Sequence, residues 1–214
     1  MTKTFRLLDL FCGAGGAAMG YHQALEEAGI PHTITGIDIN PMPRYPFEFI
    51  QADALEYVRA HGAEYDFIHA SPVCKLHSSL WAIWKRDYPD DIAAVRRLLQ
   101  ATKRNYCIEN VEGAPLENPM TLCGLMFGLR LFRHRLFELS FMTLQPYHNH
   151  AGWKAPRTSR IPGDGEVWSI YGHFSGVTAG TKAMQVDWMI QAEASQAIPP
   201  AYTRFIMRQY LGTR

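Results

Sequence analysis

The feature that most constrains the fold is a short apolar segment, residues 5–11, which runs directly into a glycine-rich turn and then into a helical pattern. A run of this length with few charges is typical of a strand buried on both faces of a parallel sheet. In the next stretch, residues 17–28, apolar side chains can line one helical face, and Gly29 and Pro31 then form a usual stop signal. The chain therefore begins with a predicted strand, turn and helix.

The same alternation of strand and helix continues along the chain. Because alternating strands and helices form parallel sheets, we expect an α/β fold with a mostly parallel, doubly wound sheet. Further strands are predicted at residues 32–39, 47–51, 65–70, 106–111 and 135–139, and helices at residues 54–60, from the cap Asp90-Asp91 to residue 101, and from Pro199-Pro200 to residue 210.

Two stretches interrupt this pattern. Residues 71–89 form a long irregular segment, and loops of that length in compact domains are usually functional. Residues 140–181 lose all periodicity and are rich in Pro, Gly, His, Trp and basic residues. With 214 residues, the chain is long enough for one core and short for two ordinary domains. We predict one Rossmann-like domain, residues 1–139 plus 182–214, and a small basic insert, residues 140–181, with no clear core of its own.

Composition excludes several classes of protein. With 47% hydrophobic and 19% charged residues, the chain is neither disordered nor collagen-like. The 21 Lys and Arg nearly balance the 20 Asp and Glu, so any nucleic-acid contact must come from a local basic surface. The four cysteines form no CxxC pair, which suits a reducing compartment, and His148 and His150 have no acidic or cysteine partner nearby in sequence, so no metal site is predicted. We see no membrane segment or targeting signal and expect a soluble protein.

Groups suited to a nucleoside pocket follow three successive strands. The glycine-rich turn, residues 13–16, lets backbone N–H groups and a helix N-terminus approach a ligand. Asp38 ends the second strand, where Rossmann-like folds place a carboxylate that accepts hydrogen bonds from a ribose. Asp53 follows the third strand, although an aspartate before a helix is also a common cap.

A thiol and a carboxyl group are predicted to face the same crevice. Cys74 follows the fourth predicted strand, and Glu109 ends the fifth. A cysteine is nucleophilic as a thiolate, and Lys75 or a helix N-terminus could lower its pKa. The alternative is that Cys74 is a small buried hydrophobic residue.

Taken in order, these segments resemble the motifs of the cytosine-C5 DNA methyltransferases. The order matches throughout and covers most of the chain. The segments are Leu8-Asp9-Leu10-Phe11-Cys12-Gly13-Ala14-Gly15-Gly16, Gly36-Ile37-Asp38, Asp53, residues 71–78, Glu109-Asn110-Val111, Arg133-His134-Arg135 and Gln196-Ala197-Ile198-Pro199-Pro200.

The resemblance implies a Rossmann-like methyltransferase fold, S-adenosyl-L-methionine as cofactor and DNA as partner. Cys74 would be the thiolate that adds to C6 of cytosine, and Glu109 would hold the base at N3 and its amino group. Arg135, and with it Arg133, would bind the base carbonyl or the backbone. The cofactor would contact Phe11, Gly13, Ala14, Gly15, Gly16, Asp38, Ile39, Asp53, Ala54 and Pro72.

The chain also departs from the family pattern at a few positions. The family usually has Pro-Cys-Gln where this chain has Val73-Cys74-Lys75, an aromatic where it has His77, and a Gln where it has Leu131. These departures leave alternatives open. The same fold could act on RNA or a free pyrimidine nucleotide, transfer a modified group, or belong to a catalytically weakened protein that only binds DNA.

The insert is the predicted nucleic-acid surface, because its basic residues are interleaved with Tyr147 and Trp153. A solvated loop of ordinary charge is the alternative. We expect a monomer with a reduced, phage-like target-recognition region, in the cytoplasm of a bacterial or phage-infected cell. The predicted nucleic-acid contacts are Lys75, Ser78, Lys154, Arg157 and Arg160.

Overall fold

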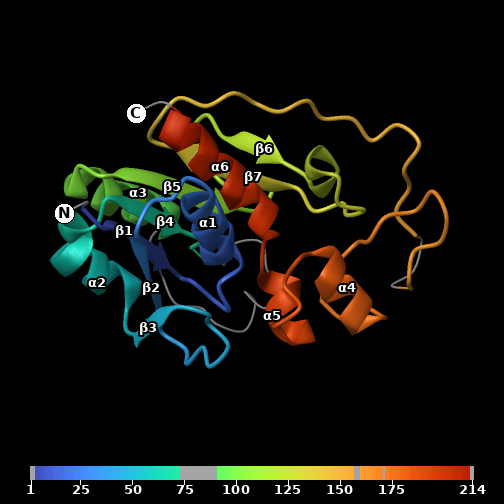
Figure 1. Ribbon diagram of the computed structural model, residues 1–214, viewed down its shortest axis with the longest axis horizontal. Coiled ribbons are helices and arrows are strands. Elements are labelled where there is room, and N and C mark those ends of the chain that lie inside the picture. The colour runs from blue at the N-terminus through green and yellow to red at the C-terminus, as the bar shows by residue number, and fades with distance from the viewer. Residues whose placement is uncertain (1–2, 73–90, 157–159, 171, 213–214) are drawn as a thin grey trace.

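The computed structural model describes residues 3–72, 91–156, 160–170 and 172–212. Its strands form one sheet in the order β3-β2-β1-β4-β5-β7-β6 (Figure 1). The first five strands in this order are parallel, β7 is antiparallel to β5, and β6 is antiparallel to β7. The predicted mostly parallel sheet is confirmed. The strands are β1 (Phe5–Leu10), β2 (His32–Asp38), β3 (Glu48–Gln51), β4 (Phe67–Ala70), β5 (Asn105–Asn110), β6 (Met120–Leu122) and β7 (Arg135–Leu139).

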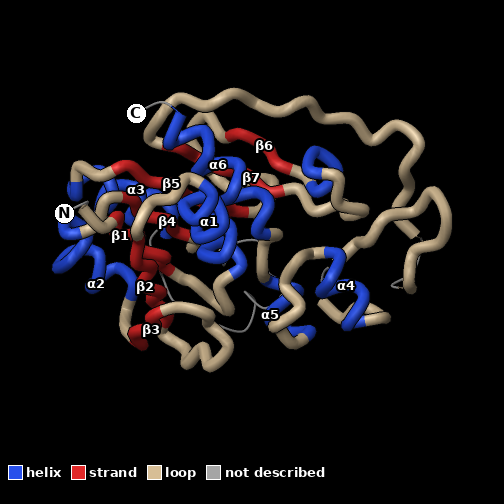
Figure 2. Tube along the Cα trace, viewed as in Figure 1, coloured by secondary structure: helices blue, strands red, loops and turns tan. Residues whose placement is uncertain are grey.

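Helices cover both faces of the sheet, as in a doubly wound fold. Figure 2 shows them in blue around the red strands. None of the helices in the described residues is long and apolar enough to cross a membrane. The helices are α1 (Gly16–Glu27), α2 (Ala54–His61), α3 (Asp91–Thr102), α4 (Val177–Ala183), α5 (Gln191–Gln196) and α6 (Pro200–Gly212), with 3₁₀ turns η1 (Gly62–Glu64) and η3 (Gly124–Phe127).

Strand β1 contributes to a separate hydrophobic core on each face of the sheet. Its alternate side chains point to opposite faces, so Phe5 and Leu7 pack with α1 and α6, whereas Leu8 and Leu10 pack with α2 and α3. All four side chains are at most 4% exposed. The apolar run is therefore buried on both faces, as its composition predicted.

Helices α1 and α6 lie against each other on one face of the sheet (Figure 1). Their closest approach is at Gly20, where a Cβ atom would lie 2.0 Å from the carbonyl oxygen of Pro200 and 2.1 Å from Oγ1 of Thr203. The hydroxyl of Thr203 donates to the carbonyl of Ala17 at 2.7 Å. The C-terminal helix is thus held directly against the helix that follows the glycine-rich turn.

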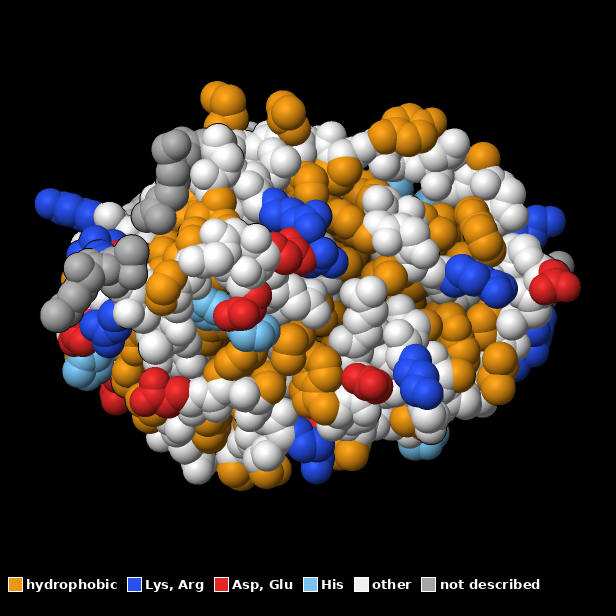
Figure 3. All heavy atoms as spheres, viewed as in Figure 1, with side chains coloured by type: hydrophobic (Ala, Val, Ile, Leu, Met, Phe, Trp, Pro, Cys, Tyr) orange, Lys and Arg blue, Asp and Glu red, His pale blue; other side chains and the backbone are white. Residues whose placement is uncertain are grey.

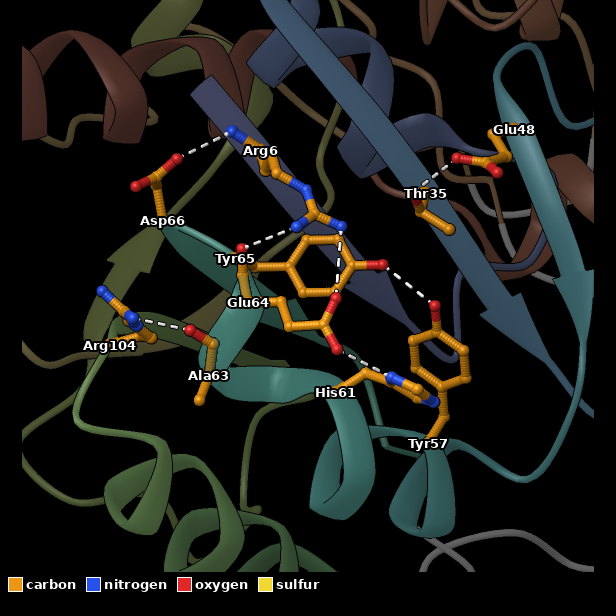
Figure 4. A network of polar contacts seen from close by, with 10 residues as sticks. All are labelled: Arg6, Thr35, Glu48, Tyr57, His61, Ala63, Glu64, Tyr65, Asp66 and Arg104. Carbon is orange, nitrogen blue, oxygen red and sulfur yellow. Dashed lines mark hydrogen bonds and ion pairs between the residues drawn. The ribbon is translucent and has the colours of Figure 1, made fainter. Parts of the chain in front are cut away.

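A polar network closes the amino-terminal edge of the sheet (Figure 4). The guanidinium of Arg6 lies 4.8 Å from the centre of the Tyr65 ring and donates to the carbonyl of Glu64 at 3.1 Å. The hydroxyls of Tyr65 and Tyr57 are 3.0 Å apart, and Arg104 donates to a carbonyl of η1 at 2.6 Å. Because these contacts fill the amino end, the opposite edge is left for a ligand.

Part of the insert packs against the main domain. Its first part is a long irregular segment (Figure 2), but Trp168, Ile170 and Phe174 are buried. They pack against Leu131 and against apolar residues between 184 and 194. This part of the insert therefore shares a core with the main domain, and Leu131, one of the departures from the family pattern, lies inside it. Of the predicted cap, Asp90 lies outside the described residues, and α3 begins at Asp91.

Candidate functional site

A cavity of about 270 Å³ opens at the carboxyl ends of β1, β4 and β5. This is the edge where ligands bind in open α/β sheets, at the point where the strand order reverses between β1 and β4. The cavity joins residues from both ends of the chain. Its lining residues are Asp9, Cys12, Gly13, Ala14, Gly16, Ala17, Met42, Ser71, Glu109, Ala192, Glu193, Gln196, Ala197 and Ile198.

The turn after β1 needs glycine because its backbone is left-handed and closely packed. Phe11, Gly13 and Gly15 have φ angles of 56°, 49° and 83°. A Cβ at Gly15 would lie 2.6 Å from Cδ of Pro46, and one at Gly16 would lie 2.5 Å from the carbonyl oxygen of Ile198. The turn therefore brings backbone N–H groups to the cavity with no side chain between.

Asp38 holds this turn from the end of β2. Its Oδ2 accepts a hydrogen bond from the backbone N–H of Gly13 at 3.2 Å, and its Oδ1 accepts from the backbone N–H of Asn40 at 2.9 Å. The next residue, Ile39, is 66% exposed, which is unusual for a large apolar side chain. Asp38 and Ile39 thus present an acceptor and an apolar surface beside the turn, and their contacts with a nucleoside stay a prediction.

Asp53 has a clear structural role. Its Oδ1 accepts from the backbone N–H groups of Leu55 and Glu56 at 2.8 and 3.0 Å, which caps α2. Ala54 is buried in the core behind it. The cap is the alternative that the sequence left open, and contacts of Asp53 and Ala54 with a cofactor stay a prediction.

Asp9 is a cavity residue that sequence reasoning missed. It is 1% exposed, and burial raises the pKa of its carboxyl well above the ordinary value. Oδ2 accepts from the hydroxyl of Tyr45 at 3.1 Å, whereas Oδ1 is a buried atom with no hydrogen-bond partner among the described residues. A carboxyl residue between buried leucines of a mostly apolar strand was the available signal.

Glu109 and Arg135 form the ion pair of the site. Arg135, at the start of β7, places its Nε 3.1 Å from Oε1 of Glu109 at the end of β5, and the two side chains are 17% and 10% exposed. Burial raises the pKa of Glu109, although Arg135, Ser71 and Arg133 each act to lower it. The structure therefore brings together two predicted catalytic residues, with a carboxyl group that holds a proton more readily than a free glutamate.

A buried chain of hydrogen bonds leads to this carboxyl group. The hydroxyl of Tyr21 lies 2.9 Å from Nδ1 of His69, and Nε2 of His69 lies 2.9 Å from Oγ of Ser71. Burial lowers the pKa of His69 to about 3, so the ring is neutral and can link a donor to an acceptor. These hydrogen bonds fix the side chain of Ser71, and a hydrogen bond from the Ser71 hydroxyl acts to lower the pKa of Glu109.

Arg133 has a framework role in the structure, and its catalytic role stays a prediction. It is 4% exposed and donates to the carbonyl of Ile170 in the insert and to that of Ser195 in α5, the latter at 2.8 Å. Burial lowers the pKa of its guanidinium to about 9. Two arginines separated by one residue look equivalent in sequence, but only Arg135 has an ion pair with Glu109 among the described residues.

The start of the irregular segment that contains Cys74 is tied to β5. Nδ2 of Asn110 donates to the carbonyl of Pro72 at 2.8 Å, and Oδ1 of the same side chain accepts from the backbone N–H of Val111. Asn110 is 5% exposed, so this contact is internal. The predicted nucleophile and loop contacts, Cys74, Lys75 and Ser78, lie outside the described residues.

The basic residues of the insert are not equivalent. Lys154 is exposed, whereas Nη2 of Arg160 lies 2.6 Å from Oε1 of Glu166. Tyr147 is 83% exposed. On the face shown in Figure 3, Lys and Arg side chains lie in separate places among hydrophobic surface. Arg157 is outside the described residues. Of the predicted contacts in the insert, Lys154 and Arg160 are both exposed, and Arg160 is the one whose charge is paired.

The C-terminal wall of the cavity comes from α5 and the segment before α6. Nε1 of Trp188 donates to the carbonyl of Ala14 at 2.9 Å, which fastens this region to the turn. Glu193 lines the cavity and pairs with Arg44, with 2.7 Å between Oε2 and Nε. The predicted last motif, residues 196–200, reaches the cavity, but Ala192 and Glu193 carried no signal in the sequence.

Comparison with known proteins supports the fold. No protein-family model matches the chain, and no curated protein sequence matches it significantly. The S. pombe Dnmt2 methyltransferase structure is 12% identical, with a TM-score of 0.60 and 99% of each chain covered. The Entamoeba histolytica methyltransferase EhMeth is 11% identical, with a TM-score of 0.56 and again 99% of each chain covered. The chain thus has the Rossmann-like fold of these methyltransferases over its whole length.

Proposed function

We propose that this protein is an S-adenosylmethionine-dependent methyltransferase that modifies C5 of cytosine in DNA. The observation that carries the proposal is the buried Glu109–Arg135 pair beside a cavity that the glycine-rich turn lines. A carboxyl group with a raised pKa can protonate or share a proton with a ring nitrogen of a pyrimidine. A protein that only held phosphates would need no such group.

The residues at the turn fit the proposed cofactor. Backbone N–H groups and the Asp38 carboxylate suit its ribose and polar groups, and Ile39 offers an apolar surface for its adenine. The unpaired Oδ1 of Asp9 is a further hydrogen-bonding atom for a polar group in the cavity. When bound, S-adenosylmethionine supplies an electrophilic methyl group. The chain orients that methyl group and excludes water from it.

The protein's own groups would activate the cytosine, in the way that the family resemblance implies. The Cys74 thiolate would form a bond to C6 while Glu109 gives a proton to N3, which leaves C5 electron-rich. C5 would then take the methyl group and a base would remove the C5 proton. The C6–S bond would break to release the thiolate, and the N3 proton would return to Glu109, which restores the ring. Arg135 would hold both the Glu109 carboxyl and the base carbonyl. A base within a duplex must leave the stack to reach these groups.

We further propose that residues 140–181 meet the nucleic acid, beside a catalytic part formed by residues 1–139 and 182–214. The exposed Tyr147 and Lys154 support this assignment, because aromatic rings stack on bases and amines pair with phosphates.

The direct test is methyl transfer from labelled S-adenosylmethionine to duplex DNA, single-stranded DNA, RNA and free deoxycytidine monophosphate, followed by identification of the modified base. We expect 5-methylcytosine in DNA. Glu109→Gln should slow transfer by ~10²–10⁴-fold without changing cofactor affinity, whereas Glu56→Gln, on the exposed face of α2, should have no effect.

The covalent step has a separate test with DNA that carries 5-fluorocytosine. Fluorine at C5 cannot be eliminated after methyl transfer, so the protein should stay bonded to the DNA through denaturing electrophoresis, and Cys74→Ala should not. Methylation of RNA and of no other substrate would show that the protein acts on RNA instead of DNA. Binding of DNA with no transfer would favour the binding protein, and transfer by a folded Cys74→Ala variant would refute the covalent mechanism.

A further inference from the structure

Four potential metal ligands meet at the junction of the insert and the sheet edge. They are Cys123, which follows β6, His134, which precedes β7, and His148 and His150 in the insert. One ligand atom of each lies within 4.8 Å of the ligand atoms of all the others. Cys123 is buried, and His134 and His150 are half-buried. Three separate segments of the chain supply these ligands, so the cluster is not a chance run of neighbouring surface residues.

Two distances between these atoms are close to those of a tetrahedral zinc site, and a third is shorter. With Zn–N bonds of about 2.0–2.1 Å and Zn–S bonds of about 2.3 Å, neighbouring ligand atoms should be about 3.3–3.6 Å apart. Nε2 of His134 lies 3.3 Å from Nε2 of His148, and Sγ of Cys123 lies 3.4 Å from Nε2 of His150. Nε2 of His148 and Nε2 of His150 are closer, at 2.7 Å.

Hydrogen bonds alone do not satisfy this arrangement well. Nε2 of His148 approaches the same kind of atom on both His134 and His150, and a neutral Nε2 either donates or accepts. At least one of the two contacts is therefore a poor hydrogen bond. Either two lone pairs face each other, or two N–H groups compete for one lone pair.

The surroundings resemble the outer layer of a metal site. Metal-bound histidines commonly direct their second ring nitrogen to a carboxylate or a carbonyl. Nδ1 of His134 lies 3.9 Å from Oε2 of Glu112, on the side of the ring away from the cluster. Phe132 stacks on His150 with 4.3 Å between ring centres, and this ring would fix the orientation of that ligand.

We propose that Cys123, His134, His148 and His150 bind one structural Zn²⁺ ion. A thiolate with three imidazoles is a borderline-soft donor set that suits zinc, and four protein ligands leave no open position for catalysis. The ion would tie the start of the insert to the β6–β7 edge and would hold His134, which lies between Arg133 and Arg135. The sequence alone predicted no metal because His150 is 27 positions from Cys123, and His148 is 14 from His134.

The test is metal analysis of the purified full-length protein. We expect about one zinc per chain in the wild type, and less than about a tenth of that in Cys123→Ser and in His148→Ala. His173→Ala is the matched control, since His173 is an exposed histidine near the end of the same insert and outside the cluster. Replacing zinc with Co²⁺ should give a thiolate-to-cobalt absorption band that Cys123→Ser lacks.

Graded variants guard against a simple loss of folding. Glu112→Ala leaves all four ligands in place and should weaken zinc affinity by about 10- to 100-fold. A chelator should lower the melting temperature of the wild type and of His173→Ala but not of His148→Ala, whose ligand is exposed at the surface. Wild-type protein that takes up no zinc on reloading, or full zinc content in folded Cys123→Ser and His148→Ala, would overturn the proposal. Neither readout depends on methyl transfer.

Discussion

Asp38 offers a sharp test of the cofactor site, because the structure shows how much of its carboxylate is already used. A carboxylate has about four acceptor positions. Three are occupied, by the backbone N–H of Gly13 at 3.2 Å, the backbone N–H of Asn40 at 2.9 Å and Nδ2 of Asn40 at 3.3 Å. About one position is left for a ribose hydroxyl.

The expected loss in Asp38→Ala follows from that single position. A hydrogen bond to a charged group contributes ~1.5–3 kcal/mol, which corresponds to a Kd weaker by about 10- to 150-fold. Asp38→Asn keeps an acceptor without the charge, so its loss should be smaller. Both variants also remove or weaken the contact with Gly13, and this contribution adds to the loss.

Calorimetry with S-adenosylmethionine and its demethylated product would measure the change. Asp164→Ala is the matched control, because Asp164 is an exposed aspartate of the insert and does not line the cavity. Unchanged cofactor affinity in a folded Asp38→Ala protein would refute the ribose assignment and with it the reading of the strand ends as a nucleoside pocket.

Three further predictions concern packing, pH and nucleic-acid binding. Gly20→Ala would place a Cβ 2.0 Å from the Pro200 carbonyl oxygen. Although alanine has the better helix propensity, this variant should lower the free energy of unfolding by ~1–2 kcal/mol in denaturant titrations. Gly212→Ala is the control, because the space around Gly212 is open, and it should not lower the free energy of unfolding. His69 has a pKa of about 3 in the folded protein and ~6.5 in the unfolded chain, so the unfolded state binds more protons between these pH values. The free energy of unfolding should therefore fall as the pH drops through that window, by up to ~1.4 kcal/mol per pH unit. A folded His69→Gln protein whose stability has the same pH slope would contradict this. Combined Lys154→Ala and Arg157→Ala should flatten the salt dependence of DNA binding by up to ~0.9 log units per lost phosphate contact, and Arg160→Ala, whose charge is paired with Glu166, should do less; an unchanged slope in the double variant would place the binding surface elsewhere.

Local sequence patterns determined most of the sheet and its helices. A strand buried on both faces must be a short apolar run, and a turn that brings backbone to a ligand must contain glycine, so β1 and the turn after it are visible in residues 5–16. Parallel strands all direct their carboxyl ends to one edge. The positions of Asp38 and Glu109 at strand ends therefore predicted that they share a site edge.

Tertiary structure decided what depends on distant partners. Helices α4 and α5 have 7 and 6 residues, too few for a clear periodic pattern, and packing against Leu131 and Trp168 supports the region around them. The division of roles between Arg133 and Arg135 likewise depends on which carbonyl or carboxylate each one meets.

The cavity wall at Glu193 and the Cys-His cluster have the same origin. Their members are separated by many residues, and no local preference links them. Local patterns report which face of an element is buried, because burial acts on each residue according to its own type. The identity of a partner across the fold is set only when the whole chain packs. For that reason the pairing of Glu109 with Arg135, the hydrogen-bond chain and the proposed metal ligands became visible only in the tertiary structure.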